Sequence, residues 1–357
     1  MNKNCILEYI WLDNNNEFKS KIRALDNVDN FENAIWCYYD SHQKKEVTLK
    51  PINKFINPFL KINNSILNNY NSYINNNIYL ILCVSSENND RNFANETNTK
   101  YILQNTLFGI KQQYLILDKT GNLPHSFKYS HIHLKDKHSF SGIGNNYGFG
   151  REFAQKHLLL CLNAGINISE INDEENGLWS FTIKPSNLLE TSDHLIVARY
   201  ILFRLCEEYT VIISFSPKEL IFPKCIVSIS NENTRGIDGI NYINSSIYNL
   251  ELYHNIKSDQ NYFDTEKIGR YNEIKKYKFK NVIINDAITM SNKNLEIFED
   301  NSHDAITMPN KNLGIFEDNR HSAFSNPYIL LSFLLKEIND ELNLINTGIM
   351  SDVNYII

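Results

Sequence analysis

Apolar residues gather in short runs in the first part of this chain and at helical spacing in the second. Runs rich in aromatic and β-branched residues occupy 7–13, 34–39, 46–50 and 78–84, and polar loops of Asn, Asp and Ser separate them. Runs of this length between turn-forming residues are typical of strands. The pattern predicts a small β-rich domain, and the polar stretch 85–95 predicts its boundary.

Helical periodicity appears after residue 150. Residues 152–163 place apolar side chains on one face, and Gly165 follows as a C-terminal stop. Residues 193–209 and 327–343 predict two further helices, the first with Ser192 or Asp193 as its N-cap. Strands and helices together predict an α+β fold with two domains, residues 1–95 and 96–357.

Composition excludes several classes of protein. The formal charge of −6 offers no basic surplus for phosphate contacts, so we expect no nucleic-acid partner. No apolar run approaches the roughly 20 residues of a membrane-spanning helix, and the N-terminus does not resemble a signal peptide. The six cysteines are scattered without a CxxC pair, which favours reduced thiols and a cytoplasmic location.

One segment is duplicated. Residues 286–303 (DAITMSNKNLEIFEDNSH) recur almost unchanged as residues 304–321 (DAITMPNKNLGIFEDNRH). Only two copies occur, so the repeat does not predict a solenoid. One copy is interpreted as an inserted loop, and either copy remains a candidate for the core position.

Eight motifs occur in a fixed order along the chain: LEYIWLD (7–13), WCYYDS (36–41), TLKP (48–51), ETNTK (96–100), FGIKQQY (108–114), AGINIS (164–169), DHLIVARY (193–200) and GIFEDNRHSAFSNPY (314–328). Each alone is weak, but their order and spacing resemble eukaryotic-type glutamine synthetases over nearly the whole chain. The resemblance implies an N-terminal β-grasp domain and a larger catalytic domain with a curved antiparallel sheet and helices. It also implies ring-shaped oligomers and the ATP-dependent ligation of ammonia to glutamate in glutamine biosynthesis, a part of nitrogen metabolism.

The resemblance further implies Mg²⁺ or Mn²⁺ and ATP as cofactors, with the metals held by five Glu and one His. Two of these six positions keep a carboxylate, Glu174 and Glu317. The other four carry Lys111, Gln113, Ser180 and Ile229. Positions where the family has arginine carry Glu266, Asn319 and either Thr307 or Thr289.

Two catalytic candidates remain by the same resemblance. Asp40 keeps the position of the acid that helps to deprotonate ammonium, and Glu273 lies one position from the flap glutamate, which aligns with Asn272. We also predict that Lys111 replaces a lost metal by pairing with Glu317. Glu174, Glu317 and Asp40 are also compatible with solvated or salt-bridged acids retained from an ancestor.

These replacements predict impaired catalysis, because removing one charge-stabilising group often costs roughly 10²–10³ in rate. The predicted function is a structural or regulatory homologue, as a homo-oligomer or in a hetero-assembly with a true glutamine synthetase. The alternative is an active glutamate–ammonia ligase with an atypical site. A separate HxHxxxxH pattern (His131, His133 and His138) is interpreted as a surface loop, with metal binding as the alternative.

Overall fold

The computed structural model describes residues 4–13, 16–26, 31–40, 44–59, 78–86, 88, 90–122, 143, 150–175, 177–216, 223–236, 238–239, 241–243, 245–246, 249–250, 288–290 and 315–339. The chain divides into two compact units. Unit 1 comprises Met1–Phe93, Ile116–Ile183 and Ser192–Ile213, and unit 2 comprises Ala94–Leu115, Lys184–Thr191 and Ser214–Ile357.

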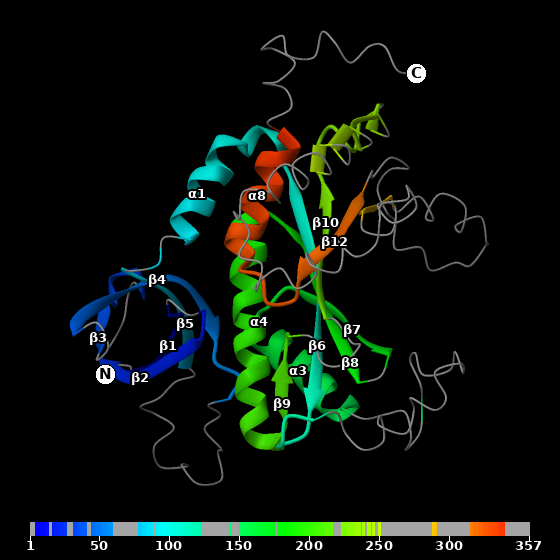
Figure 1. The fold of residues 1–357 in the computed structure, drawn as a ribbon. Helices are drawn as coiled ribbons and strands as arrows, with labels where there is room; N and C mark the ends of the chain where they lie inside the picture. Colours follow the sequence, from blue (N-terminus) through cyan, green and yellow to red (C-terminus); the bar gives the residue numbers. More distant parts are fainter. Residues whose placement is uncertain are drawn as a thin grey trace, which may run out of the picture. The chain divides into compact units, whose positions relative to one another are not determined.

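Figure 1 shows the elements in chain order. The strands are β1 (Asn4–Leu12), β2 (Phe18–Asp26), β3 (Trp36–Asp40), β4 (Lys45–Ile56), β5 (Ile78–Ser85), β6 (Leu107–Leu117), β7 (Ile168–Glu175), β8 (Leu178–Ser186), β9 (Ile212–Ser214), β10 (Lys224–Ser230), β11 (Ile288–Met290) and β12 (Phe316–Ser322). The helices are α1 (Asp90–Lys100), α3 (Arg151–Ala164), α4 (Leu188–Tyr209) and α8 (Pro327–Asn339), with short 3₁₀ turns η1 (Phe31–Asn33) and η2 (Ile102–Gln104).

The N-terminal sheet of unit 1 has the order β2-β1-β5-β4-β3 (Figure 1, blue). The interior strand β1 pairs antiparallel with β2 and parallel with β5. Leu7, Tyr9 and Trp11 on one face of β1, and Glu8 and Ile10 on the other, are all buried. Both faces of the strand are therefore covered, which explains its nearly continuous apolar sequence.

One buried carboxylate joins this sheet to α4 within unit 1. Glu8 is 1% exposed, accepts a hydrogen bond from Asn57 Nδ2 at 2.6 Å, and accepts another from the Tyr200 hydroxyl. Arg204 Nε lies 3.8 Å from Glu8 Oε1, the same oxygen that accepts the Tyr200 hydrogen bond. Burial chiefly raises the pKa of Tyr200, so this phenol stays a hydrogen-bond donor. Such satisfied polar contacts fix the direction of α4 against β1.

Helix α3 confirms the helical prediction for 152–163. Gly165 adopts a left-handed φ of 84° and donates its N–H to the carbonyls of Cys161 and Leu162, which ends the helix as expected. Inside unit 1, His157 is fully buried, and its Nε2 lies 2.9 Å from the Ala198 carbonyl. Its ring also packs edge-on against Phe181, at 4.9 Å between centroids.

The predicted start of α4 is wrong. The helix begins at Leu188 rather than near Asp193, because Asn187 caps it: Asn187 Oδ1 accepts the Glu190 N–H at 3.0 Å, and Asn187 Nδ2 donates to Glu190 Oε2 at 3.3 Å. Asp193 instead lies inside the helix and is 2% exposed. The polar stretch 85–95 also contains structure that the pattern did not predict, since helix α1 begins at Asp90.

The second sheet has the order β11-β12-β10-β6-β8-β7, with β9 beside β6. In this sheet β10 pairs antiparallel with β6 and β12, β11 pairs antiparallel with β12, and β7 pairs antiparallel with β8. The two copies of the repeat contribute differently: β11 comes from the first copy, and β12 comes from the second. The FED motif that forms the strand is therefore that of residues 316–318.

The fold class is confirmed as α+β, with an antiparallel second sheet and helices. The β-grasp topology of the N-terminal part and the division into residues 1–95 and 96–357 stay predictions. Among the described residues, no helix is both long and apolar enough to cross a membrane.

Candidate functional site

Strands β6, β10 and β12 of unit 2 present two different faces. One, the buried face, carries side chains that are 0% exposed, namely Phe108, Ile110, Val227, Ile229 and Phe316. The other, the open face, carries the partly exposed side chains of Lys111, Ile226, Ser228 and Glu317. Alternation along each strand separates the two sets, since successive side chains point to opposite sides.

Glu317 lies in a row of the open face with Ser228 and Gly109, which are its register partners across β10 and β6. The Ser228 hydroxyl donates to Glu317 Oε1 at 3.3 Å. A serine hydroxyl thus contacts the carboxylate that the resemblance assigns to a metal.

Lys111 occupies the next row, opposite Ile226. The Cα atoms of Lys111 and Glu317 lie two strands apart across the sheet and two residues apart along the strand direction. Their separation is therefore about 12 Å. Among the described residues no ion pair joins these two side chains, although Lys111 is not without an interaction of its own. The predicted Lys111–Glu317 pair is therefore not formed in the part of the chain that the structure describes.

Ile229 does not share the open face. It is the register partner of Phe108 and Phe316 and is fully buried with them. The residue of β10 that faces Glu317 is Ser228, which sequence reasoning missed. The alternation in Cys225-Ile226-Val227-Ser228 was the available signal, because it assigns Val227 and Ile229 to one side and Ser228 to the other.

Gln113 and Asn319 lie close to the open face but are held by the fold. Gln113 is 9% exposed, and its Oε1 accepts the backbone N–H of Lys224 at 3.0 Å. Asn319 lies at an irregularity in the β10–β12 pairing, between the pairs of Cys225 and Val227. Its Oδ1 is buried without a hydrogen-bond partner in the described structure.

Glu174 and Ser180 come together in unit 1, on the β7–β8 hairpin. The Ser180 hydroxyl donates to Glu174 Oε1 at 2.6 Å. The neighbouring Asp173 is 7% exposed, and its Oδ2 has no hydrogen-bond partner in the described structure. Burial raises the pKa of Asp173 to about 6, the charge of Arg151 opposes this rise, and the charge of Glu174 adds to it.

The remaining candidates are more dispersed. Asp40 is the last residue of β3 in unit 1, opposite Lys45. Glu266 and Glu273 lie outside the described residues, as do Asn272, Thr307 and the three histidines His131, His133 and His138. Thr289 is described through the backbone of β11, where it pairs with Glu317.

The described residues do not form a site for a divalent cation. In the described parts of the chain, no group of three or more His, Cys, Asp or Glu side chains is placed to hold a metal ion. Mg²⁺ and Mn²⁺ prefer oxygen ligands of carboxylates. The described positions instead offer a lysine, a serine and a glutamine whose oxygen already accepts a hydrogen bond.

Comparisons with known proteins point to one family, although no family model matches the chain. A putative glutamine synthetase of Acanthamoeba polyphaga mimivirus is 29% identical over 265 residues, which covers 70% of this chain and 72% of that protein. A glutamine synthetase of Candida glabrata is 28% identical over 272 residues, with 71% and 70% covered.

Glutamine synthetase N-1 of Phaseolus vulgaris is 30% identical over 272 residues, with 70% of this chain and 72% of that protein covered. This degree of identity over most of both proteins agrees with the ordered motifs and with the α+β fold. The chain belongs to the glutamine synthetase family.

Proposed function

We propose that this protein is a glutamine synthetase homologue that does not make glutamine and that serves a structural or regulatory role. The observation that supports this most directly is the open face of unit 2. Its acid, Glu317, is accompanied by Ser228 and Lys111, where a metal-dependent ligase needs further carboxylate or imidazole ligands.

The chemistry of the family explains why these replacements matter. Phosphoryl transfer from ATP depends on positioning and on neutralising charge with metal ions. A lysine ammonium has no lone pair to give to a cation at neutral pH. Without the cations, ATP phosphates would approach Glu317 as like charges, so we propose that Mg²⁺, Mn²⁺ and ATP bind weakly.

The hydrogen bond between Ser180 and Glu174 on the β7–β8 hairpin supports the same proposal. The Ser180 hydroxyl donates a short hydrogen bond to Glu174 Oε1, which satisfies one carboxylate oxygen from within the protein. Glu174 is thereby stabilised without a metal, as expected for a residue retained for structure. Losses at several positions that act together remove most catalysis, although their effects do not add.

A phosphate-release assay tests the proposal. Purified protein is given glutamate, ammonia, ATP and Mg²⁺ or Mn²⁺, with the Phaseolus vulgaris enzyme as the positive control. We expect no phosphate above the no-glutamate background. Glutamate-dependent turnover that Glu317→Ala abolishes would establish the alternative, an active glutamate–ammonia ligase with an atypical site.

We further propose that the protein assembles as a homo-oligomer or together with a true glutamine synthetase, in the cytoplasm. Family membership supports this, and one relative carries the name of a cytosolic isozyme. Sedimentation velocity of the protein alone, and of the protein co-expressed with an active relative, measures both possibilities. A monomer in both samples would contradict the proposal of an assembly role.

A further inference from the structure

The turn between helix α3 and strand β7 is held by a histidine of helix α4. The backbone N–H of Asn167 donates a hydrogen bond to His194 Nδ1 at 2.7 Å. On either side of it, the Ile166 N–H donates to the Cys161 carbonyl at 2.9 Å and the Ile168 N–H donates to the Ile166 carbonyl at 2.8 Å. Two of these three N–H groups thus have main-chain acceptors, whereas that of Asn167 depends on a side chain.

This contact fixes the protonation state of the ring. A backbone N–H can only donate, so the ring nitrogen that accepts it must carry a lone pair. In a histidine, the hydrogen bond made by one ring nitrogen decides which nitrogen carries the proton. His194 is therefore neutral in this structure and keeps its proton on Nε2.

The ring of His194 joins three elements of one compact unit. It packs edge-on against Phe55 of β4, with 5.5 Å between the ring centroids. His194, Phe55 and Asn167 all belong to unit 1. His194 and Asn167 are both partly exposed, so protons from the solvent reach the contact.

The charged groups on α4 and β4 near the ring have partners of their own. Asp193, the residue before the histidine, is paired with Arg91 of α1. One helical turn earlier, Glu190 accepts a hydrogen bond from the residue that caps the helix. On β4, Lys54 lies over an aromatic ring. The turn itself, residues 164–168, contains no titratable side chain.

Helix α3 and strand β7 contribute groups that are also engaged. His157 and Cys161 of α3 contact each other, with 3.3 Å between ring nitrogen and thiol. Burial lowers the pKa of His157 to about 4, so this ring stays neutral where an ordinary histidine titrates. Glu170 of β7 accepts a hydrogen bond from the Thr182 hydroxyl.

We propose that His194 is a pH-sensitive switch that holds the α3–β7 turn when it is neutral and releases the turn when it is protonated. Protonation places an N–H on Nδ1, facing the N–H of Asn167, so the hydrogen bond is lost. Its contribution to stability is present above the titration range of histidine and disappears as the pH falls through that range. Strand β7 begins at Ile168, directly after the turn, and carries Glu174 near its end. The order of the start of this strand therefore depends on pH.

Amide hydrogen exchange of residues 165–170 at about pH 8 and about pH 5 tests the switch. Each rate is divided by that of an unstructured peptide at the same pH, because the exchange chemistry itself depends on pH. We expect the protection of the parent to fall at least about tenfold at the lower pH. His194→Asn keeps an acceptor oxygen near the position of Nδ1 and does not titrate, so its protection should agree within about twofold at the two pH values. His194→Phe keeps a ring without the acceptor, so its protection should be low at both.

His157→Gln is the matched control, because it removes the other histidine that contacts α4 and leaves the switch in place. It should keep the pH dependence of the parent. The proposal is overturned if the parent is equally protected at both pH values, or if His194→Asn shows the same fall as the parent. Should His194→Asn fail to fold, the parent alone decides. Its protection must then fall at residues 165–170 and stay within about twofold at residues 6–12 of β1, and an equal fall in both segments refutes the proposal.

Discussion

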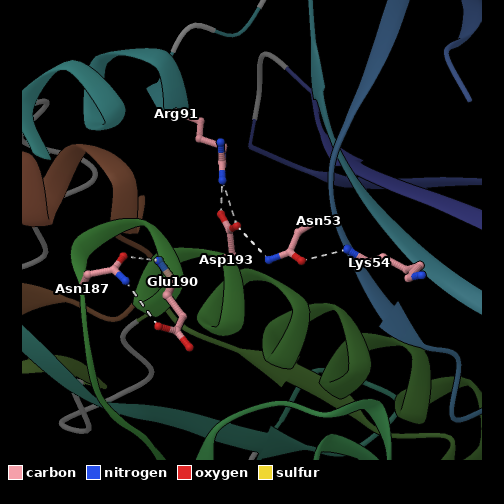
Figure 2. Close-up of polar contacts among 6 residues, drawn as sticks. All are labelled: Asn53, Lys54, Arg91, Asn187, Glu190 and Asp193. Atoms are coloured by element: carbon pink, nitrogen blue, oxygen red, sulfur yellow. Dashed lines mark hydrogen bonds and ion pairs between the residues drawn. The ribbon is translucent and has the colours of Figure 1, made fainter. Parts of the chain in front are cut away.

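Removal of the Arg91 guanidinium should destabilise unit 1, because it leaves a carboxylate buried without its cation. Figure 2 shows Asp193 of α4 with its partners. Arg91 donates from Nε to Oδ1 and from Nη2 to Oδ2, both at 3.1 Å. Asn53 Nδ2 donates to Oδ2 at 3.1 Å, and the Lys54 N–H holds the amide by bonding Asn53 Oδ1.

The structure sets the expected magnitude. The Asp193 side chain is 2% exposed, and removing one partner of a buried ion pair costs roughly 3–5 kcal/mol. The Arg91 side chain is 21% exposed, and Asn53 remains as a donor, so both facts reduce the loss. For Arg91→Met we therefore expect a loss of about 2–4 kcal/mol in unfolding free energy, somewhat below that range. Asp193→Asn, which keeps a polar side chain and removes the charge, should cost less.

Tryptophan fluorescence during urea unfolding measures this change in the right unit, since Trp11, Trp36 and Trp179 all belong to unit 1. The matched control is Lys156→Met, which removes an ion pair with Glu208. The Lys156 side chain is 38% exposed and the Glu208 side chain is 48% exposed. An exposed pair contributes about 0–1 kcal/mol. If Arg91→Met costs no more than Lys156→Met, the argument from burial is refuted.

Three further predictions follow from other parts of the molecule. Burial lowers the pKa of His157 from 6.5 to about 4, so the unfolded chain binds this proton first as the pH falls. Up to about 3 kcal/mol of unfolding free energy is therefore lost between pH 6.5 and 4, and urea titrations of His157→Gln should lack that part of the loss. Mn²⁺ should raise the melting temperature of the double variant Lys111→Glu with Ser228→His. It should not do so for Lys111→Glu with Ile229→His, because Ile229 lies on the buried face, and equal responses would disprove the assignment of faces. Deletion of residues 286–303 leaves one complete repeat, and long insertions change loop-closure entropy little, so the unfolding free energy should stay nearly unchanged. A clear drop in calorimetry would show that the first copy is indispensable.

Elements with a strong apolar period were predictable from the sequence. Strands β1 and β5 and helix α3 were found close to their observed bounds. Strand β2 was missed because Lys and Arg residues interrupt its apolar positions; its pairing with β1 along the whole length, from Asp26 opposite Asn4 to Phe18 opposite Leu12, makes it a strand. Helix α1 was missed for a related reason, since its sequence is largely polar and lacks a clear apolar stripe.

The sequence predicted which positions belong to the candidate site but not on which face of the sheet each side chain lies. Motif alignment assigned Ile229 to a ligand position, whereas the register of β10 assigns the place beside Glu317 to Ser228. A one-residue difference along a strand reverses the face on which a side chain lies. The Lys111–Glu317 pair is likewise not found among the described residues, because the two positions share a face but lie in different rows, two strands apart.

The two faces of this sheet differ in how much a substitution would cost the fold, and this difference supports the proposed loss of the family's metal ligands. On the buried face, Phe108, Ile110 and Val227 pack without exposure, and large-to-small changes there typically cost 2–5 kcal/mol. On the open face side chains are partly exposed, so exchanging a carboxylate for Lys111 leaves the core intact and also removes repulsion between neighbouring acids. Catalytic clusters are commonly destabilising, and proteins gain stability when they lose them. The proposed loss of metal ligands on the open face would therefore cost little stability, whereas substitutions on the buried face would cost much more. Retention of Glu317 fits this account, because Ser228 satisfies one of its oxygens without a metal.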